Sequence, residues 1–231
     1  AMTQGMENGL REALVAIGGL QKVRVEAQPV PVEQRHMRDF ATGVTLRDVH
    51  ALRAGASELD KVSPEMRLES SPTLMANGKS YRTFMVAGCW PIQLELVEHV
   101  VQHGRMFNEL DDENARNVCV IGTAIRDALY GSPEQIGREV VPIGDFININ
   151  NQRFKIIGMF ERYESEQDKK LRELAKDKPP EPKGGVERSK GFGGKSSKGS
   201  SMSGGFVYDM KNNTVYIPLN TMWLRFRAAS I

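Results

Sequence analysis

The sequence predicts an α+β fold in which mixed sheets pack against helices. Stretches with helical spacing and stretches of alternating apolar residues follow one another irregularly along the 231 residues. Asn77-Gly78 separates two alternating stretches and predicts a tight hairpin turn. Short connections join the predicted elements, apart from one long polar insertion. We therefore expect an α+β protein with two subdomains and a disordered insertion.

Composition and charge exclude several classes of protein. Lys and Arg number 31 against 29 Asp and Glu, a formal net charge of +2, which is too small an excess for a dedicated nucleic-acid binder. The sequence has no run of about 18 apolar residues, so no membrane span is expected within it. Its start lacks the pattern of a secretory signal, and we expect none there. The two cysteines exclude a disulfide-rich miniprotein and a four-cysteine zinc site.

The first 44 residues predict a helix, a strand and a loop. Apolar residues at helical spacing predict a helix over 6–17, which Gly18-Gly19 ends. Val23 and Val25 alternate with charged residues, a pattern typical of a half-buried strand. Residues 29–44 are rich in Pro and then polar, which favours a loop.

A capping pattern predicts the next helix. Thr45 is a good N-cap residue, and Asp48 stands three positions later, as in a variant of the capping box. We expect the helix that follows to turn Val49 and Leu52 inward and to end near Gly55.

The middle of the chain predicts a hairpin and then a long helix. An extended stretch begins at Ser63-Pro64, turns at Asn77-Gly78 and returns as one strand over 79–88. Pro91 begins a helix that runs through His103, with Gly104 directly after its end.

The later elements are shorter. Val118–Ile121 is a short apolar run that predicts a buried strand. Thr123 is expected to cap a helix through Leu129, which Gly131 ends. Strand character is also predicted over 139–143, 146–151, 154–160, around Val207 and over 214–218, before a helix-like tail over 221–231.

One segment has a composition unlike the rest. Residues 163–178 are almost all charged, and 17 of the 27 residues in 179–205 are Gly, Ser or Pro. Such a segment buries too little apolar surface to offset its ordering entropy, so we expect a disordered insertion over 161–213. Its 179–205 part carries five Lys or Arg against two Glu, which indicates a flexible solvated loop more than a contact with anionic headgroups or a partner protein.

The same elements suggest a division of the chain. We expect a first α+β subdomain over 1–86 and a second one, inserted into it, over 87–160. The flexible insertion occupies 161–213, and 214–231 returns as a strand and a tail.

The best metal candidate is a set of three side chains on the predicted helix. Glu95, His99 and His103 recur at every fourth residue, which would place them on one face, where paired imidazoles can share a zinc ion. The set lacks the His-Glu pair of a zinc protease and has no fourth ligand. A solvated helix face is therefore the favoured interpretation, and we expect no metal.

Other motifs are weak. Gly194-Lys195-Ser196 resembles the end of a phosphate loop, but Ser189 stands where that loop needs its first Gly. The acidic residues of 109–113 lack the alternation of a calcium loop and indicate a solvated turn. Cys89 and Cys119 either form a disulfide or are small buried hydrophobes. Core or interface packing is expected for Trp90 and Trp223, which lie in apolar stretches.

An ordered series of short segments runs along the chain and consists of Phe84–Gly88, Gly104–Phe107, Asp111-Asp112, Val118–Gly122, Leu129–Gly131, Ile136–Arg138, Phe154–Gly158 and Val215–Thr221. This series resembles a known family, the MacB-like periplasmic core domain of ABC transporter permeases in the macrolide-exporter and lipoprotein-release class. Its family-motif positions, expected to be structural, are Gly88, Gly104, Arg105, Asp112, Gly122, Gly131, Gly137, Gly158 and Pro218. Residues 161–213 depart from the family, whose connection there is usually shorter, and the family usually continues with a further strand–helix–strand unit after the point where this sequence stops.

The resemblance implies a non-catalytic domain on the periplasmic side of the bacterial inner membrane. It would couple ATP-driven motion of the membrane part to substrate or adaptor engagement during export or lipoprotein release. Implied partners are an ABC ATPase domain or subunit, a second permease copy and a periplasmic adaptor (membrane-fusion) protein, with membrane spans flanking the chain. No cofactor and no nucleic acid are implied.

Two alternatives stay open at this point. The chain could be a self-standing periplasmic binding or adaptor module, without a permease. It could also be a metal-dependent enzyme that uses Glu95, His99 and His103, which ranks last.

Overall fold

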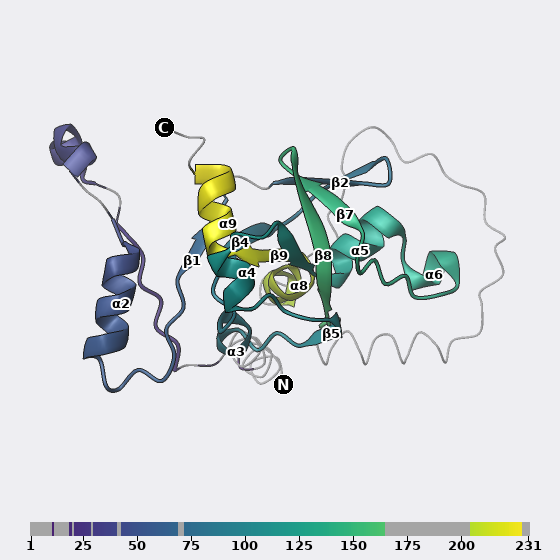
Figure 1. The fold of residues 1–231 in the computed structure, drawn as a ribbon, viewed down its shortest axis with the longest axis horizontal. Helices are drawn as coiled ribbons and strands as arrows, with labels where there is room; N and C mark the ends of the chain where they lie inside the picture. Colours follow the sequence, from purple (N-terminus) through teal and green to yellow (C-terminus); the bar gives the residue numbers. More distant parts are fainter. Residues whose placement is uncertain are drawn as a thin grey trace, which may run out of the picture.

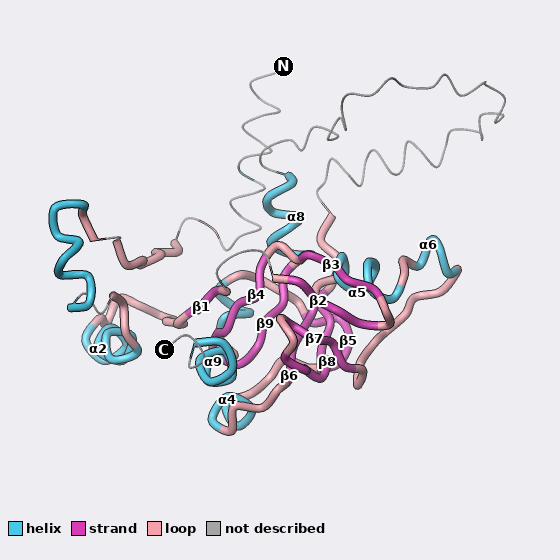
Figure 2. The backbone as a smooth tube through the Cα atoms, turned by 90° about the horizontal axis from the view of Figure 1, so that it is seen from above, coloured by secondary structure: helices cyan, strands magenta, loops and turns pink. Residues whose placement is uncertain are grey.

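The computed structural model describes residues 11, 19, 21–28, 30–40, 43–68, 72–164 and 204–227. Nine strands in these residues form one mixed sheet in the order β1-β4-β9-β6-β8-β7-β2-β3, and β5 pairs with β8 beside this path (Figures 1 and 2). The strands are β1 (Glu65–Arg67), β2 (Thr73–Ala76), β3 (Lys79–Arg82), β4 (Met85–Cys89), β5 (Val101–Gly104), β6 (Val118–Ile121), β7 (Phe146–Ile149), β8 (Gln152–Phe160) and β9 (Thr214–Pro218). The helical segments are η1 (Val32–Phe40), α2 (Leu46–Gly55), α3 (Gln93–Leu96), α4 (Glu109–Glu113), α5 (Thr123–Tyr130), α6 (Pro133–Ile136), α8 (Gly204–Asn212), α9 (Leu219–Met222) and η2 (Trp223–Arg227).

The last strand in the chain, β9, lies inside the sheet between β4 and β6. All five of its residues are buried. It runs parallel to β4 and antiparallel to β6, so it joins two strands that are far from it in the sequence. The strand predicted over 214–218 is therefore confirmed, and it connects β4 to β6 in the sheet.

Alternating side chains divide the apolar residues between the two faces of the sheet. One face carries a first core, in which α5 and α9 contribute Ile125, Leu129 and Met222. The other face carries a second core, in which α3 and the segments around α4 contribute Val97 and Phe107. Strands of the predicted subdomains 1–86 and 87–160 share this one sheet, and the division into subdomains stays a prediction.

The hairpin at Asn77-Gly78 is confirmed. Both residues have positive φ, and β2 pairs with β3 directly across them. The single return strand predicted over 79–88 is wrong, because it breaks at Thr83 and Phe84 into β3 and β4. The hydroxyl of Thr83 donates to the main-chain oxygen of Asn213 at 2.8 Å, and this contact directs β4 toward β9.

The segment before β1 is an extended arm, which Figure 1 shows beside the sheet. The capping box of Thr45 and Asp48 is confirmed, and α2 ends at Gly55 with Val49 buried. Leu52 is 39% exposed, which corrects its expected inward position. The loop predicted over 29–44 contains η1 (Val32–Phe40) instead.

The strand predicted at Val23 and Val25 is wrong. Both side chains are largely exposed, and no strand of the described residues lies beside them to pair with. Alternation alone cannot form a strand without a partner. Nearly all of the helix predicted over 6–17 lies outside the described residues, as does most of the insertion predicted over 161–213.

The helix predicted from Pro91 to His103 is also wrong. The α-helix α3 ends at Leu96, Glu98 adopts φ 50°, and the amide of His99 donates to the carbonyl of Leu94 at 3.0 Å. This is the geometry of a Schellman ending, formed here without a glycine. The Nζ atom of Lys211 donates to the carbonyls of Val97 and Glu98 at 2.6 and 2.7 Å, so these carbonyls are not available to continue the helix.

Smaller corrections concern the later elements. Gly122, not Thr123, is the N-cap of α5, while Gly131 ends the helix as expected. The segment 139–143 forms no strand, and Val207 lies in the helix α8. The tail is helical as α9 and η2 through Arg227. Among the described residues, no helix combines the length and apolar character that crossing a bilayer requires.

The Gly122→Ala substitution should destabilise the sheet. A Cβ atom there would lie 2.0 Å from the main-chain oxygen of Asn212, which can yield only if α8 and β9 move. We expect the free energy of unfolding to fall by about 2 kcal/mol or more in urea titrations followed by circular dichroism. The control is Gly55→Ala, where nothing lies within 4 Å and stability should be unchanged or slightly raised. Equal losses in the two variants would contradict the packing argument.

Candidate functional site

The three residues of the metal hypothesis do not form a common face. Glu95 lies on α3 and pairs with Lys61 at 2.9 Å. His99 follows the turn after α3, and His103 lies on the strand β5, 3.6 Å from a carboxylate oxygen of Glu139. Among the residues that the structure describes, no three His, Cys, Asp or Glu side chains are grouped as metal ligands would be. The helix face that the hypothesis required does not exist.

His99 is instead a buried aromatic side chain. Its ring stacks on Phe160 with centroids 4.6 Å apart and meets the ring of Tyr216 edge-on at 5.4 Å. Neither ring nitrogen has a hydrogen-bond partner in the described part of the chain. Burial, and then the charge of nearby Lys211, lower the pKa of His99 to about 3, so the imidazole is neutral at physiological pH.

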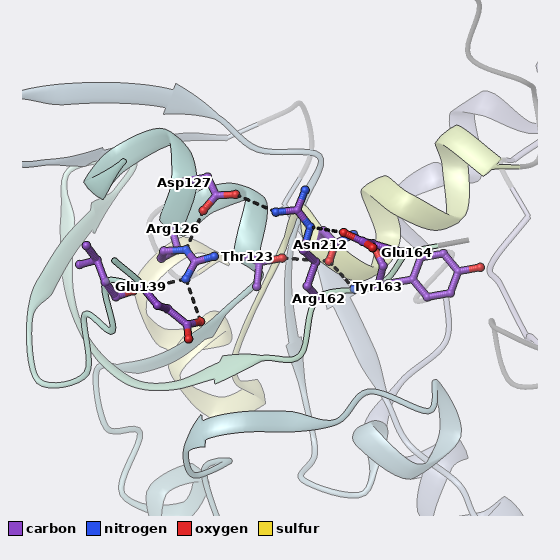
Figure 3. A network of polar contacts seen from close by, with 9 residues as sticks. Thr123, Arg126, Asp127, Glu139, Arg162, Tyr163, Glu164 and Asn212 are labelled. Carbon is purple, nitrogen blue, oxygen red and sulfur yellow. Dashed lines mark hydrogen bonds and ion pairs between the residues drawn. The ribbon is translucent and has the colours of Figure 1, made fainter. Parts of the chain in front are cut away.

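A polar network joins the two ends of the insertion to the body, and Figure 3 shows it at close range. Its centre is the fully buried side chain of Asn212, at the end of α8. The Asn212 oxygen accepts from the Thr123 hydroxyl and from the Tyr163 amide, both at 2.9 Å. Its Nδ2 donates to the Tyr163 carbonyl at 2.8 Å. One amide therefore connects α8, the start of α5 and the segment after β8.

Charged side chains extend the network along α5. Arg126 is 2% exposed, and its guanidinium contacts Asp127 at 2.7 Å and Glu139 at 3.0 Å. Asp127 also contacts Arg162 at 3.4 Å, and Arg162 contacts Glu164 at 3.2 Å. The buried charge of Arg126 thus has two partners of opposite sign, which is the condition for tolerating it inside a protein.

A second polar cluster connects the β5–α4 segment to α9. Arg105 donates to a carboxylate oxygen of Asp111 at 2.7 Å, and Asn108 and Asp111 form a reciprocal capping box at the start of α4. Asp112 accepts from the main-chain amide of Asn220 at 2.8 Å. Burial opposes ionisation of Asp111, but the contact with Arg105 lowers the pKa of that carboxyl overall. Because Asp111 and Asp112 are buried, the solvated turn expected over 109–113 is wrong.

The glycines of the motif series occupy positions of close approach or of positive φ. Gly104 and Gly158 oppose each other across β5 and β8, where a Cβ on either would lie 2.2 or 2.4 Å from a main-chain oxygen. Gly88 lies under Met222 of α9. Gly131 and Gly137 end α5 and α6 with φ 100° and 77°. Pro218 ends β9 opposite Cys89. The structural roles expected for the motif residues stay a prediction.

The remaining candidates have ordinary positions. Cys89 and Cys119 are both free and buried, and burial raises the pKa of each thiol. Trp90 packs beside His50 with ring centroids 5.7 Å apart, and Trp223 is 52% exposed. The phosphate-loop candidate around Lys195 lies outside the described residues.

Sequence reasoning missed Asn212, Arg126 and Lys211. An Asn-Asn pair directly before an apolar strand is visible at 212–213, but its partners are 49 and 89 residues distant in the chain. No local sequence pattern specifies such contacts, so these residues can be identified only from the tertiary structure.

The chain has a match among known protein families. A family model described as the MacB-like periplasmic core domain matches residues 1–172 of the chain. The chain belongs to the MacB-like periplasmic core domain family. It is accordingly a periplasmic (extracytoplasmic) domain of an ABC transporter permease.

Curated relatives of the MacB-like domain are much longer proteins. The macrolide export ATP-binding/permease protein MacB of Bdellovibrio bacteriovorus is 29% identical over 116 residues, 50% of this chain and 16% of the relative. The pyoverdine export ATP-binding/permease protein PvdT of Pseudomonas entomophila is 28% identical over 116 residues, with the same coverage. The chain thus spans about one sixth of the length of these relatives.

Two solved structures share the fold. The periplasmic region of MacB from Actinobacillus actinomycetemcomitans superposes with a TM-score of 0.52 at 15% identity, over 87% of this chain and 67% of that one. The extracellular domain of the noncanonic ABC-type transporter YknZ from Gram-positive bacteria gives a TM-score of 0.55 at 14% identity, over 88% and 76%. At such identity the likeness concerns the fold alone.

The buried His99 of the MacB-like domain should make stability pH-dependent. Between the ordinary histidine pKa of 6.5 and the folded value of about 3, the unfolded chain binds more protons than the folded one. Stability therefore falls as the pH falls through this window. We expect the His99→Phe variant, which keeps the ring contacts, to show a smaller loss between pH 6.5 and 4 in urea titrations. Identical pH slopes in both proteins would contradict the assignment.

The Asn212→Ala variant should lose the connection between α8, α5 and the segment after β8. Removing the amide leaves the buried Thr123 hydroxyl and the half-buried main-chain groups of Tyr163 without this partner, so the free energy of unfolding should fall by about 2–4 kcal/mol. The matched control is Asn148→Ala, an exposed position on β7 where a change within about 0.5 kcal/mol is expected. Similar effects of the two substitutions on urea midpoints would show that Asn212 does not hold the network together.

Proposed function

We propose that the chain is the non-catalytic coupling domain of an export permease. ATP hydrolysis takes place in a separate ATPase domain or subunit, and the resulting motion of the membrane part is transmitted to this domain. The domain then engages the exported substrate or a periplasmic adaptor protein and moves largely as a rigid body about its membrane junctions. A second permease copy completes the transporter.

The family match over residues 1–172 is the observation that supports this proposal most directly. The names of the curated relatives describe proteins that combine ATP binding, a permease and export, which is consistent with an ATPase partner. The contacts around Gly122, Asn212 and β9 join elements from distant parts of the sequence, and such a body is suited to moving as one unit.

Sequencing the gene on both sides of the region that encodes this chain is the first test. The proposal expects a run of about 20 apolar residues shortly before the chain and further such runs after it. A reading frame without flanking apolar runs would contradict the permease and favour the self-standing binding module.

Transport assays on the full-length transporter test the coupling. In proteoliposomes, the Gly122→Ala variant should lower substrate export per ATP hydrolysed, because loosening the centre of the sheet weakens the transmission of motion. The Gly55→Ala variant should export as the wild type does. Export per ATP that is unchanged by Gly122→Ala, in a variant shown to be destabilised, would contradict the proposal.

A further inference from the structure

One end of the sheet has a face that no other element of the described residues covers. This part consists of the hairpins β2–β3 and β7–β8, which we call the wing. Side chains that alternate along the wing, including Leu74, Ile147 and Phe154, belong to the first core, on the face that α5 covers. The second core, on the opposite face, contains no residue of β2, β3 or β7. The outer face of the wing is therefore exposed.

The outer face combines two cations with two large apolar side chains. The guanidinium of Arg153 lies 3.9 Å above the ring centre of Phe146. Lys155 stands directly opposite Phe146 across the β7–β8 pair, and Asn148 stands opposite Arg153. Met75 is the neighbour of Asn148 on β2. Phe146 and Met75 are each 47% exposed, so they add little to the interior.

The charges on this face are of one sign. Arg153 and Lys155 are exposed and form no ion pair with a described residue, and Arg82 is a third exposed cation on the same face. The two hairpins, residues 73–82 and 146–160, contain no Asp or Glu. Asp145, directly before β7, acts electrostatically on Tyr130, which packs against the first core. A locally basic surface stands out in a chain whose net charge is only +2.

The contact with Phe146 preorganises the Arg153 guanidinium for binding an anion. Contact with the Phe146 ring restricts the Arg153 side chain, so less rotamer entropy is lost when its N–H groups bind an anion. The planar guanidinium matches the two oxygens of a carboxylate, and Lys155 supplies a second cation two residues away on the same face. The apolar surface of Met75 and Phe146 lies beside these two charges.

We propose that the outer face of the wing is a docking surface for an acidic protein segment. Carboxylates of this segment bind Arg153 and Lys155, and an apolar side chain between them contacts Phe146 and Met75. The positive charges of Arg153 and Lys155 favour an acidic partner. The apolar side chains of Phe146 and Met75 favour a polypeptide over a simple anion. The Arg153 guanidinium lies over the Phe146 ring and the face belongs to a sheet, which favours an extended segment over a bilayer surface.

The test uses the 231-residue chain and a labelled peptide of alternating Glu and Leu as the probe. Fluorescence anisotropy should give a dissociation constant below about 1 mM at low ionic strength, weakening as salt is added. The Arg153→Glu, Lys155→Glu double variant should bind at least tenfold more weakly. The control double variant Arg35→Glu, Arg47→Glu changes the net charge equally on the arm and should differ from the wild type by less than twofold.

The apolar part of the surface is tested separately. Phe146→Ser and Met75→Ser should each weaken peptide binding several-fold. If the peptide bound through charge alone, these two substitutions would leave the dissociation constant unchanged. Thermal unfolding confirms that each variant is folded, and because both side chains are half exposed, both variants should fold. Absence of wild-type binding, or an equal loss in the arm control, would overturn the proposal. Binding of phosphatidylglycerol vesicles through Arg153 and Lys155 without peptide binding would overturn it in favour of a membrane surface.

Discussion

The contact between Gly122 and the main chain of Asn212 is the constraint on which the rest of the fold depends. A Cβ at residue 122 would lie 2.0 Å from the Asn212 oxygen, so the two segments meet more closely than side chains allow. The amide of Gly122 donates to Thr214, the first residue of β9, at 3.0 Å. The same approach brings the Asn212 side chain to Thr123 and Tyr163. The strand β9, the start of α5 and the two ends of the insertion are positioned by one close contact.

Elements specified by neighbouring residues could be predicted from the sequence. The turn at Asn77-Gly78 needs two residues that tolerate positive φ, and both are present. The capping box of Thr45 and Asp48 involves residues three apart and forms as expected. The apolar runs 118–121 and 214–218 were predicted as strands and form β6 and β9 in the structure. A short apolar run between turn residues is typical of a buried strand.

Elements that depend on distant residues could not be predicted. The spacing of Glu95, His99 and His103 is compatible with a helix, but Lys211 occupies the carbonyls that the helix would need. Lys211 is more than one hundred residues distant in the chain, and nothing local indicates it. Residues Val23 and Val25 alternate with charged residues, but no strand of the described chain pairs with them, so they form no strand. The motif glycines could be identified from the family resemblance in the sequence. The buried amide of Asn212 could be identified only from the structure.

The position of β9 has a consequence for how the chain folds during synthesis and export. The strands β4 and β6 flank β9 in the sheet, but both emerge long before it, with the insertion in between. Until residue 218 is available, each of them has an apolar edge with unpaired main-chain groups, which is a template for aggregation. In a nascent chain these two edges stay unpaired until the insertion has been synthesised, so the sheet is completed only by a pairing of distant segments.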